Sequence, residues 1–454
     1  MDISKSKLIK YFRESFPEYS KLTLSEIFAI RHVDSQFMND VYSLYDPSFR
    51  TKNMIIKDLF LLDWTELFKQ YKIKVYMKTG AKYRFYPDKE QEVLIAKTSG
   101  CTRFVWNHIL AFRNDQYQQG VKLNSKAISK ALTALKREPE NKFLNDVSMV
   151  PLQQALINQN KAFERFFKKK SAFPQVKRKH NRQSFTLMKN AFKIENNQVF
   201  IAKCKTPLNI VWSRKLPGEV SSLTISKEPS GKYFISFVCE KTIKPLPVTN
   251  KTCGIDIGLK DLLCFDNGKK EHDLKSYLKY EQEVKFLQRK LSRFDEKRKK
   301  QGFKFSDSSR KREKLRIRLA RVKEKIAFIR KDFIHKLTTN IVKENQIICV
   351  EDLAVKNMIK NRRLSRRIHE AAWGEILRQL TYKSLWYGRT LIKISRWYPS
   401  SKTCSTENCG YVMSKLPLSV RSWVCPSCGT QHDRDINAAC NIKASGLLVM
   451  ASGV

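Results

Sequence analysis

Four cysteines near the C-terminal end of the sequence form two close pairs, and no other feature constrains the fold as strongly. Four residues separate Cys404 from Cys409, and two residues separate Cys425 from Cys428. Four thiolates suit tetrahedral zinc, and a shell closed by four sulfurs leaves no position open for a substrate. The sequence therefore predicts one structural zinc ion in a zinc knuckle at residues 404–428.

The alternative interpretation of these cysteines is a set of free or disulfide-linked thiols. The chain has 11 cysteines, most of the others stand alone in apolar or mixed segments, and no secretory signal is evident. This pattern favours a reducing compartment, in which disulfides are rare. The first pair is more widely spaced than is common, but both spacings close a turn around a metal, and the zinc interpretation is preferred.

The charge of the chain indicates a polyanionic partner. With 88 Lys and Arg against 43 Asp and Glu, the formal net charge is +45, far more than solubility requires. Nucleic acid is the expected partner. The alternative is an anionic membrane surface, but no segment offers the roughly 18 or more apolar residues of a membrane span. The basic residues are also spread along the chain rather than on one amphipathic helix, so we expect no membrane association.

The first 72 residues differ in charge from the rest of the chain. They contain 11 basic and 10 acidic residues, so this segment is nearly neutral. Its apolar residues recur at spacings that suit short helices. We expect residues 1–72 to form a separate N-terminal extension that packs on the protein, contacts a protein partner or mediates self-association.

Residues 73–248 combine strand and helix patterns. The alternating residues at 76–88 stop at a proline, as expected of a strand, and short alternating segments with turns between them return at 184–248. Between these segments, apolar residues at 91–113 and 152–168 recur at three- and four-residue steps, which predicts helices. The simplest arrangement is an antiparallel β-barrel with a helical insertion.

Three acidic residues stand where catalytic carboxylates are expected. Asp256 lies in an apolar strand between glycines, Glu351 ends the apolar run Ile347–Val350, and Asp435 follows the cysteines at a helix start. An acid among apolar neighbours costs free energy unless a cation or hydrogen bonds compensate it. Taken singly, each of the two strand acids could be a strand-end cap or a surface acid. Taken together, three carboxylates can hold two magnesium ions about 3.5 to 4 Å apart for phosphodiester cleavage.

Other chemistries lack the residues that they need. The sequence has no Gly-x-x-x-x-Gly-Lys loop, so ATP hydrolysis is not indicated. Its seven histidines never form a close pair, which argues against a transposase with a His-x-His metal site. Carboxylates suit magnesium because it prefers hard oxygen ligands, whereas histidine or cysteine would select another metal.

The segment between Asp256 and Glu351 predicts two long helices. Apolar residues recur at three- and four-residue steps over 277–294 and 315–333, and the loop at 297–312 between them is rich in Lys and Arg. For any single cation, a solvated position and a contact with phosphate are equally compatible with the pattern. We therefore expect a helical hairpin, some of whose cations contact nucleic acid.

Several motifs occur in an order that resembles one protein family. They are Gly-Ile-Asp256-Ile-Gly, Val350-Glu351-Asp352-Leu-Ala-Val-Lys356, Arg396-Trp-Tyr-Pro-Ser-Ser-Lys-Thr-Cys404 and Asp433-Arg434-Asp435-Ile-Asn-Ala-Ala. With Tyr83-Arg-Phe-Tyr-Pro near the start, the resemblance covers residues 76–445. On these motifs the chain resembles the TnpB family of insertion-sequence-encoded, RNA-guided DNA endonucleases, which is related to the type V CRISPR effectors and the Fanzor proteins.

The resemblance implies a multidomain α+β protein. The implied parts are a wedge β-barrel, a helical recognition domain, a RuvC-like nuclease domain of the RNase H-like α/β fold with the zinc knuckle inside it, and a short tail. In this sequence they would occupy residues 76–88 with 184–248, 89–183, 249–445 and 446–454, respectively.

The resemblance also implies residue roles, cofactors and partners. Asp256, Glu351 and Asp435 match the family's catalytic acids, which bind two Mg²⁺ ions, and the second aspartate of Asp433-Arg434-Asp435 is the matching one. The implied activity is cleavage of target DNA, directed by a transposon-derived guide RNA of the omega type and by a short motif beside the target. The residues expected to contact nucleic acid are Tyr83, Arg84, Gln153, Gln154, Gln159, Lys161 and Arg434. For Tyr83, core packing competes with stacking on a base.

Two other functions stay open. One is an RNA-guided DNA-binding protein that represses transcription or assists transposition without cleavage, which the loss of an acid would have favoured. The other is a transposase that uses the same acids for strand transfer, since an RNase H fold with magnesium serves either reaction. We expect a cytoplasmic, nucleoid-associated protein if the source is prokaryotic, and a nuclear one if it is a eukaryote or its virus.

Overall fold

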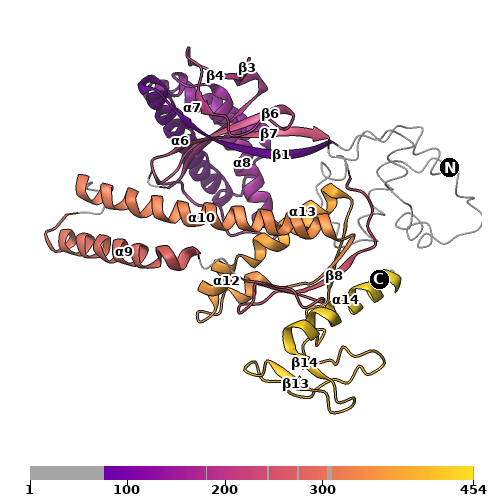
Figure 1. The fold of residues 1–454 in the computed structure, drawn as a ribbon. Coiled ribbons are helices and arrows are strands. Elements are labelled where there is room, and N and C mark those ends of the chain that lie inside the picture. Colours follow the sequence, from indigo (N-terminus) through magenta and orange to yellow (C-terminus); the bar gives the residue numbers. More distant parts are fainter. Residues whose placement is uncertain (1–75, 180, 243–244, 273–275, 304–308, 453–454) are drawn as a thin grey trace, which may run out of the picture. The chain divides into compact units, whose positions relative to one another are not determined.

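A computed structural model (Figure 1) describes residues 76–179, 181–242, 245–272, 276–303 and 309–452. The predicted N-terminal extension at residues 1–72 lies outside these residues. The described chain falls into two compact units. One consists of Lys78–Lys241 with Gln282–Glu324, and the other includes Thr242–Glu281 with Lys325–Val454.

The first unit contains a five-stranded sheet in the order β2-β6-β7-β1-β5. Its strands are β1 (Tyr76–Tyr86), β2 (Gln183–Met188), β5 (Asn209–Val211), β6 (Glu219–Lys227) and β7 (Tyr233–Thr242). The pairs β2–β6, β6–β7 and β1–β5 are antiparallel. Among the described residues β2 and β5 are the ends of the sheet, so the closed barrel stays a prediction.

A separate hairpin belongs to the same unit. It joins β3 (Phe192–Glu195) to β4 (Gln198–Ile201) through Asn196 and Asn197. Both asparagines have positive φ, at 47° and 63°, as a tight two-residue hairpin turn requires. Val199 and Ile201 of β4 join the apolar cluster of the five-stranded sheet, so the hairpin packs on the core of that sheet.

Helices fill the chain between β1 and β2. They are α6 (Lys89–Gln118), α7 (Ser125–Arg137), the short 3₁₀ helix η2 (Pro139–Asn145) and α8 (Met149–Phe167). Asp88 starts α6 with a capping box, since its carboxylate accepts from the Gln91 backbone N at 2.8 Å and the Gln91 side chain accepts from the Asp88 backbone N. A second apolar cluster, including Ile109, Leu132 and Leu152, holds these helices together.

The second unit is built on a mixed five-stranded sheet in the order β10-β9-β8-β11-β12. Its strands are β8 (Thr252–Asp256), β9 (Leu263–Phe265), β10 (Lys270–Glu271), β11 (Ile347–Glu351) and β12 (Thr390–Ile394). The neighbours β8–β9 and β9–β10 are antiparallel, whereas β8–β11 and β11–β12 are parallel. The three parallel strands therefore end at the same edge of the sheet.

Both faces of this sheet are covered, as its near-continuous apolar strands predict. Ile348 and Val350 of β11 pack with α10 (Arg310–Glu344) and α13 (Trp373–Tyr387) in one cluster. Cys349, between them, packs with Ile442 of α14 (Arg434–Ser452) in another. Successive side chains of a strand point to opposite faces, so α14 lies on the face opposite α10 and α13.

A glycine lets α14 approach β8 closely. A Cβ atom on Gly254 would lie 2.1 Å from the Ala439 carbonyl oxygen and 2.7 Å from Lys443 Cβ, both on α14. We expect Gly254→Ala to destabilise the protein by about 1–3 kcal/mol, because backbone must move to make room. Gly100→Ala in α6 is the control: no atom lies within 4 Å of its added Cβ, and replacing this helix glycine should stabilise by about 0.5–1 kcal/mol. Urea unfolding separates the two, and equal stability of Gly254→Ala and the wild type would contradict the close approach.

Two long helices occur where the sequence predicts them. They are α9 (Ser276–Lys300) and the start of α10, and they run antiparallel, since Arg312 pairs with Asp295 at 2.5 Å and Arg318 with Glu283 at 3.0 Å. None of the helices among the described residues is long and apolar enough to span a membrane.

Candidate functional site

The sheet of the second unit brings two of the predicted acids to one edge. Asp256 is the last residue of β8 and Glu351 is the last residue of β11. The register pairs Val350 with Ile255, so the two acids occupy the next position on adjacent parallel strands. Both are preceded by three buried residues, which fixes the strand ends and holds the carboxyl groups at the border of the core.

The third acid comes from the start of α14. Asp433, the last residue of β14 (Gln431–Asp433), caps this helix, because its Oδ1 accepts from the backbone N of Asp435 at 3.0 Å and of Ile436 at 3.1 Å. Lys270 of β10 pairs with its other oxygen at 2.8 Å. The two aspartates of Asp433-Arg434-Asp435 thus have separate roles, and Asp435 is the one that remains available to the site.

The three acids interact electrostatically. Burial, followed by the charges of Glu351 and Asp435, raises the pKa of Asp256 to about 7. Burial also raises the pKa of Glu351, against a hydrogen bond from Ser400 Oγ to its Oε1 at 2.6 Å. The structure therefore brings together the three acids that the sequence predicts, although their oxygens do not form a cluster within 4.8 Å like the one formed by the described cysteines.

Two asparagines to which the sequence analysis gave no role, one of them inside the quoted motif that starts at Asp433, link the acids to the cysteine loop. Asn437 and Asn441 of α14 are buried and both donate to the carbonyl oxygen of Thr403, at 2.7 and 2.6 Å. Asn441 also donates to the Ser400 carbonyl oxygen at 2.8 Å. The two asparagines are four residues apart, with Ala438 and Ala439 between them in the sequence, so they lie on one face of the helix. This spacing is the sequence signal from which they could have been found.

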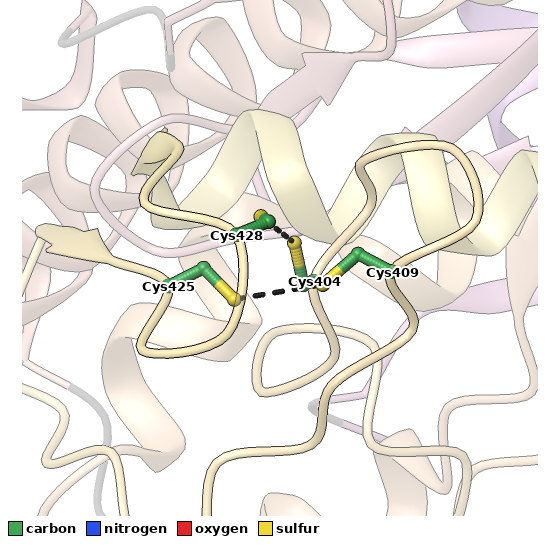
Figure 2. A group of neighbouring side chains, drawn as sticks. All are labelled: Cys404, Cys409, Cys425 and Cys428. Atoms are coloured by element: carbon green, nitrogen blue, oxygen red, sulfur yellow. Dashed lines mark hydrogen bonds between the residues drawn. The ribbon is translucent and has the colours of Figure 1, made fainter.

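The four cysteines converge from two turns (Figure 2). Their Sγ atoms all lie within 4.8 Å of one another, with 3.6 Å between Cys404 and Cys428 and 3.7 Å between Cys409 and Cys425. A tetrahedral zinc ion with bonds of about 2.3 Å needs sulfurs about 3.8 Å apart. The cluster therefore has the size and donor set of a four-thiolate zinc site.

Two further residues tie the cysteine cluster to α14. The Nε2 atom of His432 lies 3.0 Å from Cys404 Sγ, and its ring packs on Trp423 with centroids 4.8 Å apart. Arg434 is 8% exposed, and its Nη1 donates to the carbonyl oxygens of Pro417 at 2.6 Å and Val420 at 3.4 Å. The start of α14, and with it Asp435, is thus connected to the loop that the cysteines close.

The residues predicted to contact nucleic acid divide by exposure. Gln153 and Lys161 are exposed on α8, and Gln154 and Arg84 are partly exposed. The side chains of the other three, Arg434, Tyr83 and Gln159, are buried and therefore not accessible to a nucleic acid.

Tyr83 and Gln159 are held in the interior by particular contacts. The Tyr83 ring packs edge-on against Trp212 and Phe237, at 5.0 and 5.8 Å between centroids, so core packing takes the place of base stacking. Gln159 is fully buried and its Nε2 donates to the Trp106 carbonyl oxygen at 2.8 Å. Both side chains therefore have structural roles in this unit.

Three family descriptions match separate parts of the chain. The matches are "Helix-turn-helix domain" over residues 77–122, "Probable transposase" over 236–362 and "Cas12f1-like, TNB domain" over 373–442. The second contains Asp256 and Glu351, and the third contains the four cysteines and Asp435. The first covers β1 and α6, so that segment folds as a strand and one long helix rather than as two helices joined by a turn.

Two curated relatives match most of the chain. One is a protein of Streptomyces pristinaespiralis named "Putative RNA-guided DNA endonuclease", 43% identical over 83% of this chain and 91% of its own length. The other is "Putative RNA-guided DNA endonuclease InsQ" of Escherichia coli K12, 30% identical over 82% of this chain and 93% of that one. A "TnpB-like protein L79" of Acanthamoeba polyphaga mimivirus is 27% identical over 50% of this chain and 43% of its own.

The matches, the fold and the site define the chain as a multidomain α/β protein of a transposon-related class. It belongs to the TnpB family, as its motifs predict. The solved structure of the mini-RNA-guided endonuclease CRISPR-Cas phi3 covers 90% of this chain and 99% of its own, at 11% identity and a TM-score of 0.42, which is too low to define the fold.

Proposed function

We propose that this protein is an RNA-guided DNA endonuclease that cleaves with Asp256, Glu351 and Asp435. The observation that carries the proposal is the convergence of these acids from β8, β11 and α14 on one edge of the sheet. The names of the relatives with 43% and 30% identity support the same activity.

The strand order supports a RuvC-type nuclease domain of the RNase H-like fold. Three strands, β8 to β10, form an antiparallel meander, and β11 and β12 continue the sheet in parallel on the other side of β8. This order places the first strand at the centre with an acid at its end. A second acid ends the adjacent strand, so two carboxylates that can bind metal ions lie on neighbouring strands.

The acids fit magnesium as ligands. They are hard oxygen donors, and burial together with the charges of Glu351 and Asp435 destabilises the charged form of Asp256, which a bound cation would compensate. When bound, two magnesium ions would activate a water and stabilise the leaving oxygen of the phosphodiester. Ser400 orients the Glu351 carboxylate through its 2.6 Å hydrogen bond, and Arg421 Nη1 lies 3.4 Å from Asp435 Oδ1.

The cysteine cluster would hold one zinc ion with a structural role. A shell of four thiolates leaves no ligand position for water or substrate. The zinc site would instead contribute to activity by fixing the position of α14, through the contacts of Arg434 and Asn437 with the loop that contains Cys404. Zinc binding and the placement of Asp435 are therefore coupled.

We expect Cys425→Ser to lose zinc, to lower stability and to reduce cleavage together. Removing one of four thiolates weakens a site whose binding energy contributes to folding. Elemental analysis should find about one zinc per wild-type chain and much less in the variant. Cys204→Ser, outside the cluster, is the matched control and should keep its zinc. A soluble and active wild-type protein without zinc would contradict this account.

The large positive charge suits guidance by RNA. When base pairing supplies sequence specificity, the protein has to hold the guide–target duplex through its backbone and shape, which needs many cations and few base-reading side chains. Of the α8 residues predicted to contact the short motif beside the target, Gln153 and Lys161 are exposed and Gln154 is partly exposed. We assign them to that contact.

The test uses the protein expressed with its flanking genomic DNA and purified with the RNA that it binds. The complex is incubated with magnesium and a plasmid library in which the sequence beside the target is randomised. RNA-dependent cleavage restricted to one flanking motif is the expected result. RNA-dependent binding without cleavage would replace the proposal with a regulatory protein, and joining of transposon ends to target DNA without RNA would replace it with a transposase.

A further inference from the structure

One tryptophan of the second unit lies almost entirely in solvent. Trp397 is 86% exposed, whereas Trp373 and Trp423 of the same unit are 4% and 6% exposed. Tryptophan side chains are usually largely buried, because their apolar surface is large. An exposed indole at a defined position offers a ligand a large, flat apolar face.

The turn that carries Trp397 lies at the edge of the sheet where the acids lie. β12 ends at Ile394, whose Cα partner in the parallel register is Glu351. Trp397 follows three residues later. Since β8, β11 and β12 are parallel neighbours, the turn after β12 leaves the sheet on the side of Asp256 and Glu351.

On both sides of Trp397, this turn is fixed by contacts with Glu351 and Asp352, at the end of β11. Arg396, immediately before it, forms an ion pair with Asp352, and Ser400, three residues after it, donates to Glu351 at 2.6 Å. Backbone hydrogen bonds from Tyr398 N to Ser395 O at 3.1 Å and from Ser400 N to Tyr398 O at 2.8 Å fix the turn further. The indole is thus exposed on a fixed backbone rather than on a long loop.

The segment that follows Glu351 in the chain also carries exposed cations. Lys356, Lys360, Arg362 and Arg363 are all exposed. None of the four forms an ion pair with a carboxylate of the described residues, whereas Arg366 in the same segment pairs with Glu281 and Glu370. The cations and the exposed indole lie in segments that follow the neighbouring parallel strands β11 and β12. Together they favour a ligand with both phosphates and flat rings.

We propose that Trp397 stacks on an unpaired base of the single-stranded DNA that enters the acidic site, while the cations of residues 356–363 contact its phosphates. This inference rests on the proposed nuclease function. A single strand is favoured over a duplex because only unpaired, unstacked bases offer a free face to the indole. DNA is favoured over RNA because the neighbouring acids are those assigned to DNA cleavage.

The test measures binding of a short single-stranded DNA to the RNA-loaded complex that carries Asp256→Ala, so that the DNA is not cut. Trp397→Ala should weaken binding by about tenfold, the usual size of one base–aromatic stack, and Trp397→Tyr should restore most of it. The single-stranded DNA should also quench tryptophan fluorescence of the complex that keeps Trp397, and this quenching should be smaller in Trp397→Tyr. Duplex DNA should not quench the fluorescence.

A matched control separates stacking from a general effect of removing an exposed apolar side chain. Leu448 is 69% exposed on α14, 13 residues beyond Asp435, which is about 20 Å along the helix. Leu448→Ala should leave DNA affinity and quenching unchanged. Equal affinity and equal quenching in Trp397→Ala and the parent complex would overturn the inference. In that case, RNA-dependent cleavage by the complex with an intact Asp256 would still support the proposed nuclease function. The stacking proposal can therefore be refuted without refuting the nuclease.

Discussion

Replacing Asp256 with alanine is expected to slow target cleavage by at least about a thousandfold, a loss of roughly 4 kcal/mol of transition-state stabilisation. Asp256 is the acid whose pKa responds to both Glu351 and Asp435, so it is central to the cluster. Binding of RNA and of target should be unchanged, because the substitution removes one carboxylate from the cleavage site. Cleavage rates and gel-shift affinities, measured on the same preparation, check both halves of this prediction.

Asp332 provides the control for that experiment. It lies on α10 with 64% of its side chain exposed and pairs with Lys336 one turn along the helix. Exposed pairs of this kind contribute little to stability, so Asp332→Ala should cleave at close to the wild-type rate. Substantial cleavage by Asp256→Ala would remove the three acids from the mechanism, whatever the RNA dependence of the activity.

The second large effect is on stability: Asp256→Asn should stabilise the metal-free protein at about pH 8 by on the order of 2–4 kcal/mol. The pKa of Asp256 is raised from its ordinary value of 3.8 to about 7 in the folded protein. Below pH 3.8 the carboxyl group is protonated in both states. Between the two pKa values the unfolded state ionises first, so stability falls as the pH rises, and above about pH 7 the full penalty remains.

An asparagine at this position has no such penalty, so its advantage should shrink from about pH 8 to about pH 5. Thermal unfolding at the two pH values, without divalent cations, measures the difference. Added magnesium should narrow the gap at the higher pH, since an ion that binds the folded wild type stabilises it. An advantage of the same size at both pH values would show that the charge of Asp256 is not the cause.

The sequence predicts the acids and the cysteines because their signals are local. Glu351 ends a short apolar run, and Asp256 stands inside another, which in the structure ends at Asp256 itself. An acid in such a run needs water or a cation, so it stands out in the sequence. The cysteine pairs carry their own turn residues. These positions can be assigned without knowing which strands are neighbours.

The sequence could not predict the links between these parts, because they depend on contacts between distant segments. Arg434 resembles a phosphate-binding cation in the sequence, but its guanidinium is buried against carbonyl oxygens of the cysteine loop. The sequence does not distinguish Ser400 and Asn441 from other polar residues, because their hydrogen bonds depend on where the fold positions β12 and α14. Closure of the barrel is likewise a matter of pairing between strands far apart in the chain.

Gln159 is different, because the sequence contained the signal for its burial. It follows Leu152, Ala155 and Leu156 at seven-, four- and three-residue steps, which places it on the buried face of α8. Gln153 and Lys161 fall on other faces of the same helix and are exposed. Helical periodicity was therefore a better guide to these glutamines than their polarity.

The most direct test of RNA guidance is to replace the guide segment of the bound RNA and follow the position of the cut. The complex is assembled with two RNAs that differ only in that segment and is given one plasmid that contains both matching targets beside the same flanking motif. The account predicts that each RNA directs magnesium-dependent cleavage to its own target and that Asp256→Ala cuts neither. Cleavage at the same position with both RNAs, or without RNA, would contradict it.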